Sequence, residues 1–217
     1  MLKSKGTQVC VPFLLTFINK YVIIMLLGED IMDIRERYNS LLERNLNLDN
    51  IDEVIALKNE CKFNNNYEYF YLTNLLIMDI YINENLLTDA LNIAFKNFDD
   101  LDPTLYKKVY VSLLERQIYI FIQKKNFQSA YRYANEKRKY IDTSDINEVN
   151  RWYLEMAYIH DALNEKSRSL SDLIGILENN PDDDLKLIVL NNITKLYIDS
   201  KNIECAKDYL NRSLELA

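Results

Sequence analysis

His160 is the only histidine of the chain and is followed directly by Asp161, so this pair is the first place to look for acid–base chemistry. A general acid or base is usually a histidine or a carboxylate that a neighbouring group orients. Adjacent residues on a helix point in different directions, however, and His160 occupies a position where aromatic residues recur in this chain. We therefore expect His160 to have a structural role.

Other residues that often carry chemistry are sparse. Gly175 is the only glycine beyond the first thirty residues, whereas loops that cradle phosphates need several glycines. The acidic run Asp182 to Asp184 lacks the alternating ligands of a calcium loop and is typical of a helix N-terminus. Three cysteines are widely spaced, without a Cys-x-x-Cys pair: Cys10, Cys61 and Cys205. We expect no cofactor, no metal site and no enzymatic activity.

The composition limits the elements that could position a site. The 217 residues include only three glycines and three prolines, against 48% hydrophobic residues. An all-β fold needs many tight turns, so we expect an all-α protein. The formal net charge of −7 argues against a dedicated nucleic-acid binder, which needs a basic surface.

Residues 1–31 form an apolar N-terminal segment with two interpretations. Val9 to Leu27 is strongly apolar, but Lys20 near its middle makes it a weak membrane anchor. Alternatively, translation starts at Met32 or Met25 and the upstream residues are not part of the native protein. We expect a cytoplasmic protein, with a membrane-anchored one as the alternative.

Residues 32–66 are predicted to form an N-terminal helical pair that caps the rest of the chain. Apolar residues recur at helical spacing from Asp33 to Arg44 and again after Asn50. Asn50 is the expected N-cap of the second helix, with Glu53 three residues later as in a capping box.

From residue 67 onward the chain repeats itself. Small residues recur 40, 39 and 37 residues apart, at Ala90, Ala130, Ser169 and Ala206. A large residue stands nine positions before each of them, at Tyr81, Phe121, His160 and Tyr197. A polar turn lies between the large and the small residue of each unit: 83–85, 124–126, 164–166 and 200–202. Each unit is therefore predicted to be two helices joined by a short turn.

Signals for helix starts and ends lie between these units. Asp102, Pro103 and Thr104 are predicted to open one helix, and residues 142–145 another. Residues 180–184 should end one helix and start the next.

The repeated region, residues 67–217, resembles the tetratricopeptide repeat family, whose unit has about 34 residues. In the last unit the small and large positions of the family fall on Leu190, Tyr197, Ala206, Leu210 and Ser213. In the third unit they fall on Tyr153, Ala157, Ser169, Leu173 and Pro181. The resemblance implies four antiparallel helix pairs stacked as an α-solenoid.

The first two units depart from the family pattern. They have Met78 and Ile118 where the first helix usually carries a small residue, and the units are longer than the family's. Other helical-hairpin repeats therefore remain alternatives.

If the units stack as in that family, their first helices line a concave groove. The residues expected to face it are Asp79, Asn83, Glu115, Arg116, Tyr119, Gln123, Arg151, Tyr158, Asp161, Asn191, Asn192 and Lys195. Amides can pair with backbone groups of an extended peptide, and Arg and Lys can bind a carboxylate. We therefore expect a protein or peptide partner.

Two alternatives remain for the function. Residues 124–139 contain six cations among several tyrosines and could bind RNA or an acidic partner, or be a solvated outer helix face. A membrane-tethered assembly scaffold would use residues 9–27 as its anchor.

The usage of Asn, Ile and Lys suits a low-GC bacterial genome, in which such arrays resemble the sensor halves of peptide-pheromone receptors. Those receptors generally begin with a DNA-binding domain, for which the two helices of 32–62 are too few. A regulatory role would therefore act through protein contact.

Overall fold

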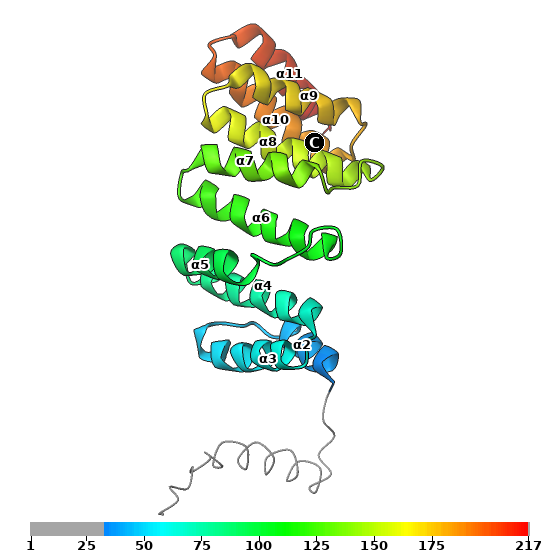
Figure 1. The fold of residues 1–217 in the computed structure, drawn as a ribbon. Coiled ribbons are helices and arrows are strands. Elements are labelled where there is room, and N and C mark those ends of the chain that lie inside the picture. The colour runs from blue at the N-terminus through cyan, green and yellow to red at the C-terminus, as the bar shows by residue number, and fades with distance from the viewer. Residues whose placement is uncertain (1–32, 217) are drawn as a thin grey trace, which may run out of the picture. The chain divides into compact units, whose positions relative to one another are not determined.

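The computed structural model describes residues 33–216, drawn in colour in Figure 1. Every regular element in this range is helical, with ten α-helices, one 3-10 helix and no strand, which confirms the predicted all-α class. The predictions for residues 1–31, for an anchor at 9–27 and for a start at Met32 lie outside the described residues.

The chain divides into two compact units, Met1–Arg44 and Asn45–Ala217. Of the first unit, the structure describes helix α2, Ile34–Leu42, which is led by Asp33 as its N-cap. The second unit contains all the other elements. The predicted pairing of the two helices within 32–66 stays a prediction.

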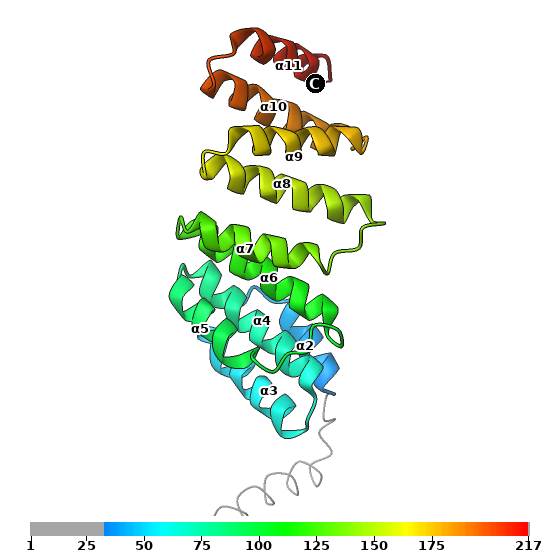
Figure 2. The same cartoon turned by 45° about the horizontal axis from the view of Figure 1, so that its top comes forward.

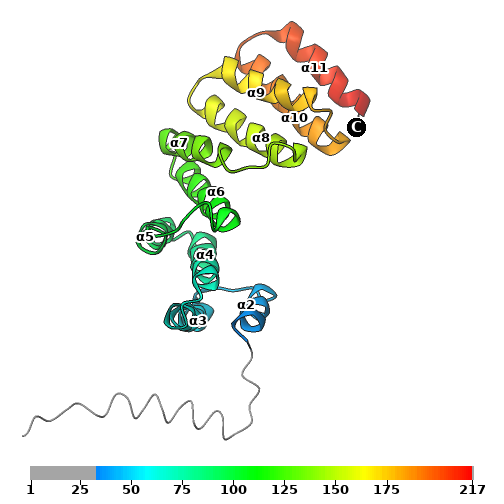
Figure 3. The ribbon, with the colours of Figure 1, turned by 45° about the vertical axis from the view of Figure 1, so that its right-hand side comes forward.

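The second unit runs through ten elements in chain order. They are η1 (Leu48–Asn50), α3 (Ile51–Phe63), α4 (Tyr67–Asn83), α5 (Leu87–Asn97), α6 (Lys107–Gln123), α7 (Phe127–Arg138), α8 (Ile146–Ala162), α9 (Lys166–Glu178), α10 (Asp183–Asp199) and α11 (Ile203–Leu216). Neighbouring helices pack against one another from α3 to α11 (Figure 2). Figure 3 shows α4, α6, α8 and α10 along one side of this unit and α5, α7, α9 and α11 along the other.

The turns between paired helices share one backbone geometry. A residue with positive φ follows each first helix: Asn85 (58°), Lys125 (56°), Asn164 (63°) and Lys201 (59°). The next residue donates its N–H to a carbonyl five residues earlier, at 2.7 to 2.9 Å, and that carbonyl belongs to Tyr81, Phe121, His160 or Tyr197. This is the Schellman arrangement that ends a helix, so each predicted turn is a true helix stop. Asn65 (55°) gives the turn between α3 and α4 the same form.

The four recurring small residues are buried where paired helices meet. Ala90, Ala130, Ser169 and Ala206 are between 0% and 4% exposed, which confirms their packing role. Ser169 also donates its hydroxyl to the carbonyl of Ala157 at 2.8 Å, so this position links α9 to α8 by a hydrogen bond as well. A small side chain here lets two helix axes approach closely.

Leu210, one of the positions of the family pattern in the last unit, is not buried. It is 43% exposed, whereas Leu173, the residue 37 positions earlier in α9, is 2% exposed. The reason is that α10 covers Leu173, while no described helix follows α11.

Four helix starts test the boundary predictions. Asp145 and Asp182 cap α8 and α10 as expected, each accepting backbone N–H groups of the first turn. The predicted start at Asp102 is wrong, because Asp102 closes a turn onto Thr104 and α6 begins only at Lys107. Asn50 precedes α3 but makes no side-chain cap, since its side chain accepts the N–H of Asn47 within the 3-10 turn.

Candidate functional site

The twelve residues expected to face a groove all lie on α4, α6, α8 and α10, on one side of the second unit (Figure 3). Three are half-buried: Asp79, Arg116 and Asp161. The other nine are exposed: Asn83, Glu115, Tyr119, Gln123, Arg151, Tyr158, Asn191, Asn192 and Lys195. We call this surface the first-helix face.

Asp79 and Arg116 join two successive first helices. Arg116 donates Nε to Asp79 Oδ1 at 2.7 Å and Nη2 to Asp79 Oδ2 at 2.6 Å, and its Nη1 reaches the carbonyl of Ser112 at 2.9 Å. Such a two-pronged ion pair is among the stronger polar contacts in proteins. Its main effect is to tie α6 to α4, so neither side chain is free for a ligand.

Asp161 and Lys195 make the corresponding contact further along, between α8 and α10. Lys195 Nζ lies 3.3 Å from Asp161 Oδ2, and 64% of the lysine side chain stays exposed. This pair is therefore open to solvent and to exchange with a ligand. Asn191 is partly occupied too, because its Oδ1 accepts the hydroxyl of Ser213 on α11 at 2.9 Å.

A cavity of about 180 Å³ opens on the first-helix face between α8, α9 and α10, and we call it the α8–α10 cavity. Four of the predicted residues border it: Tyr158, Asp161, Asn192 and Lys195. The rest of its lining is mostly apolar and consists of Leu154, Ala157, Ser169, Leu173, Ile188 and Leu196. The sequence did not single out Ile188, because it stands within the apolar run 187–190 and carries no signal that separates it from core residues.

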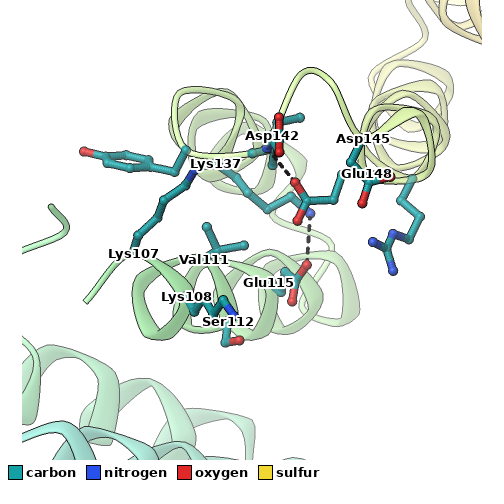
Figure 4. Close-up of a pocket in the computed structure, with 12 residues that line it drawn as sticks. Lys107, Lys108, Val111, Ser112, Glu115, Lys137, Asp142, Asp145 and Glu148 are labelled. Atoms are coloured by element: carbon teal, nitrogen blue, oxygen red, sulfur yellow. Dashed lines mark hydrogen bonds and ion pairs between the residues drawn. The ribbon is translucent and has the colours of Figure 1, made fainter. Parts of the chain in front are cut away.

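A second cavity, of about 560 Å³, lies between α6, the end of α7 and the start of α8 (Figure 4). It is lined by charges of both signs, and only Glu115 and Arg151 of the predicted residues reach it. The newly found charged members are Lys107, Lys108, Lys137, Asp142, Asp145 and Glu148. Three of these carboxylates already accept backbone N–H groups around the start of α8. Each of these contacts uses one oxygen of its carboxylate, so these residues help to form the start of α8.

Lys137 is the least expected of these residues, because it is a lysine only 5% exposed. Its Nζ lies 2.9 Å from Glu155 Oε2 and 3.7 Å from Glu115 Oε1, the latter contact drawn in Figure 4. Burial raises the pKa of Glu155, and the ammonium of Lys137 partly offsets that shift. A buried charge of this kind persists only when it is paired.

The basic stretch 124–139 does not form one exposed basic surface. Lys137 is buried, Arg138 lies over the ring of Trp152 at 5.2 Å, and Lys139 pairs with Glu136 at 2.7 Å. The interpretation of these cations as a single solvated helix face is therefore wrong for Lys137. The burial of Lys137 was not visible in the sequence, because the acidic partner of this lysine, Glu155, comes from the next helix pair.

His160 is buried and does not face Asp161. Its Nδ1 lies 2.6 Å from Asp172 Oδ2, and its ring packs 5.5 Å from that of Tyr131. Burial raises the pKa of the Asp172 carboxyl, and the imidazole partly offsets that shift. The pair joins α8 to α9, in keeping with the structural role expected for His160.

Residues 33–216 contain no group of three metal-binding side chains, and no helix among them is both long and apolar enough to cross a membrane. Comparison with protein-family models, with curated proteins and with solved structures found no match.

Proposed function

We propose that residues 67–217 form four tetratricopeptide-like helix pairs, stacked as an α-solenoid: α4–α5, α6–α7, α8–α9 and α10–α11. The support is the recurrence of the same three features in each pair. These are a Schellman turn, a large residue whose carbonyl accepts its hydrogen bond, and a buried small residue nine positions later. Each pair leaves apolar surface that only the next pair covers, as in repeat proteins generally.

We infer that the array is a non-enzymatic module that binds an extended peptide or protein segment on the first-helix face. The observation that carries this inference is the α8–α10 cavity, which joins an apolar interior to four polar residues of that face. Ligand sites commonly combine a mostly apolar concave surface with a few polar groups that fix orientation. Such a module would have a regulatory or sensor role that acts through protein contact.

The chemistry of the face favours a peptide over a small charged metabolite. Its exposed amides, Gln123 and Asn192, each offer a donor and an acceptor to a peptide backbone. Its exposed tyrosines, Tyr119 and Tyr158, offer flat apolar surface with a polar tip, which is common at protein interfaces.

Selection of random peptides displayed on phage against the full chain tests this function. The selected peptides should lose at least tenfold in affinity when Arg151→Ala is combined with Asn192→Ala. The matched control combines Arg132→Ala with Gln128→Ala on α7, where both side chains are also exposed, and should leave affinity unchanged. Equal losses in both double variants, or failure to enrich any peptide, would contradict the proposal.

A further inference from the structure

We propose that the α8–α10 cavity is a pocket for one aliphatic side chain, of leucine or isoleucine size, from the bound segment. This inference rests on the proposed function and assigns to it a specific contact. The pocket would fix the register of the segment along the first-helix face, because a single side chain must enter at one place.

The interior of the pocket is mostly apolar. Ala157, Leu173 and Leu196 are 3%, 2% and 5% exposed, so they form a rigid floor that belongs to the core of the α8–α10 region. Apart from Tyr158 at its mouth, the lining has one hydroxyl, that of Ser169, which already donates to the carbonyl of Ala157. The interior therefore holds no uncommitted donor for a charged or strongly polar group, which disfavours such ligands.

Ala157 explains why the space exists in this unit. The corresponding residues of the two preceding first helices, 39 and 79 positions earlier, are Ile118 and Met78, which are 1% and 0% exposed. Those larger side chains fill the position that Ala157 leaves open. The pocket is thus a consequence of one small residue within otherwise similar units.

The mouth of the pocket carries apolar surface that is exposed to water and that a bound side chain would cover. Ile188 is 49% exposed and Tyr158 is 55% exposed, and they come from different helices, α10 and α8. The ion pair of Asp161 with Lys195 also lies at the pocket, and Asn192 offers an amide for a peptide backbone. A side chain entering here would bury apolar surface of its own and of the mouth, which favours binding.

The volume suits an aliphatic side chain. A dry cavity of about 150 Å³ lined by Leu, Ile and Phe binds benzene, so a space of this scale holds one small apolar group. The α8–α10 cavity measures about 180 Å³. A branched aliphatic side chain fills such a space without requiring a hydrogen bond inside it.

The test is an NMR titration of the full chain with N-acetyl-leucinamide, with N-acetyl-glycinamide as the matched probe that lacks the side chain. The leucine probe should shift the amide signals of residues lining the pocket, and the glycine probe should shift them far less. Ile188→Ser should weaken leucinamide binding at least fivefold. Ile198→Ser is the matched control, because Ile198 is a similarly exposed isoleucine of α10 outside the pocket, and it should leave binding unchanged.

A second variant fills the pocket from within. Ala157→Ile copies the residue that α6 has at this position and should abolish the leucinamide shifts, provided that its melting curve remains cooperative. If that variant does not fold, Ile188→Ser still decides the question, since Ile188 lies on the surface. Shifts elsewhere in the chain, or no effect of Ile188→Ser, would overturn the pocket.

Failure of the pocket can be distinguished from failure of the proposed function. The pocket alone would be overturned if phage-selected peptides bind the first-helix face without an aliphatic residue and if Ile188→Ser leaves their affinity unchanged. If no peptide is enriched while leucinamide still binds at the predicted residues, the pocket stands and the broader function fails.

Discussion

The contact of α7 with α8 and the contact of α9 with α10 occupy the same place in successive units, yet they are built from different chemistry. Counting from the small residues Ala130 and Ser169, Lys137 corresponds to Ile176. Ile176 is fully buried in an aliphatic cluster with Val189 and Ile193. Lys137 is almost as buried but is held by the carboxylate of Glu155.

The next position along each helix shows the same difference between a polar contact and an aliphatic one. Arg138 lies over the ring of Trp152, and the Trp152 indole donates to the carbonyl of Ala134 at 2.9 Å. The position of Arg138 is taken in α9 by Leu177, which packs against the aliphatic cluster. One backbone arrangement thus accepts either a polar and aromatic contact or an aliphatic one. The first depends on both partners being present, whereas the second depends on volume.

Removing one partner of the polar contact should have the largest effect. We expect Lys137→Met to lower the free energy of unfolding by about 3 to 5 kcal/mol, because it leaves the Glu155 carboxylate buried without a counter-charge. Urea denaturation at neutral pH measures this loss.

The control removes both charges together. Lys137→Met combined with Glu155→Leu should recover most or all of the lost stability, since a buried ion pair can be replaced by apolar residues at little cost. A double variant as unstable as Lys137→Met would contradict the view that the unpaired carboxylate causes the loss.

Truncating the aliphatic counterpart should have a slightly smaller effect. Ile176→Ala removes buried volume from a fully enclosed site, so we expect a loss of about 2 to 5 kcal/mol in the free energy of unfolding. Ile176→Val, which removes a single methylene, should cost about 0.5 to 1.5 kcal/mol. Thermal and urea unfolding measure both values, and a loss for Ile176→Ala no larger than for Ile176→Val would refute the volume argument.

The two contacts should also differ in their response to pH. Burial holds the pKa of Glu155 in the folded chain above its ordinary value of 4.5, so the folded state holds this proton more tightly than the unfolded state. The stability that this proton contributes is present below pH 4.5 and is lost as the pH rises through the raised pKa. Denaturation at several pH values should show this loss in the wild type.

Glu155→Gln should remove that part of the pH dependence. Burial also raises the pKa of the Asp172 carboxyl, so Asp172→Asn serves as the comparison. Ile176→Ala should lower stability by the same amount at every pH, because it changes no titrating group. A pH profile unchanged by Glu155→Gln would count against a buried carboxylate at this contact.

The smallest expected effect concerns the stacked arginine. Arg138→Gln removes the cation from the face of Trp152, and a partly exposed contact of this type contributes about 0.5 to 1 kcal/mol. A double-mutant cycle with Trp152→Leu isolates that coupling. A coupling energy near zero would mean that Arg138 acts only through packing of its aliphatic stem.

The sequence predicted the features that depend on local chemistry. The turns were recognisable as short runs of polar residues, and Asn or Lys stands where the backbone adopts positive φ. The small residues were recognisable because they recur at a nearly regular distance. Ala90 and Ala130 are fully buried as expected, and Asp182 caps α10. These features follow from residue type and spacing alone.

Features that depend on distant partners could not be predicted. Lys137 looks like a surface lysine until Glu155 is placed beside it, and Asp79 looks like a ligand-binding carboxylate until Arg116, 37 residues later, engages it. The start of α6 was misplaced because Asp102 and Pro103 are equally suited to a turn. Nothing local in the sequence distinguishes these alternatives.

Photo-crosslinking with a phage-selected peptide tests the central claim, that a partner binds on the first-helix face, most directly. Benzoylphenylalanine would replace Tyr119 or Tyr158 on the first-helix face, or Phe95 on α5 as the control. These residues are 47%, 55% and 49% exposed, so the three positions are similarly accessible. We predict crosslinks from positions 119 and 158 and none from position 95. Crosslinks from position 95 with none from the other two would contradict the assignment of the binding face.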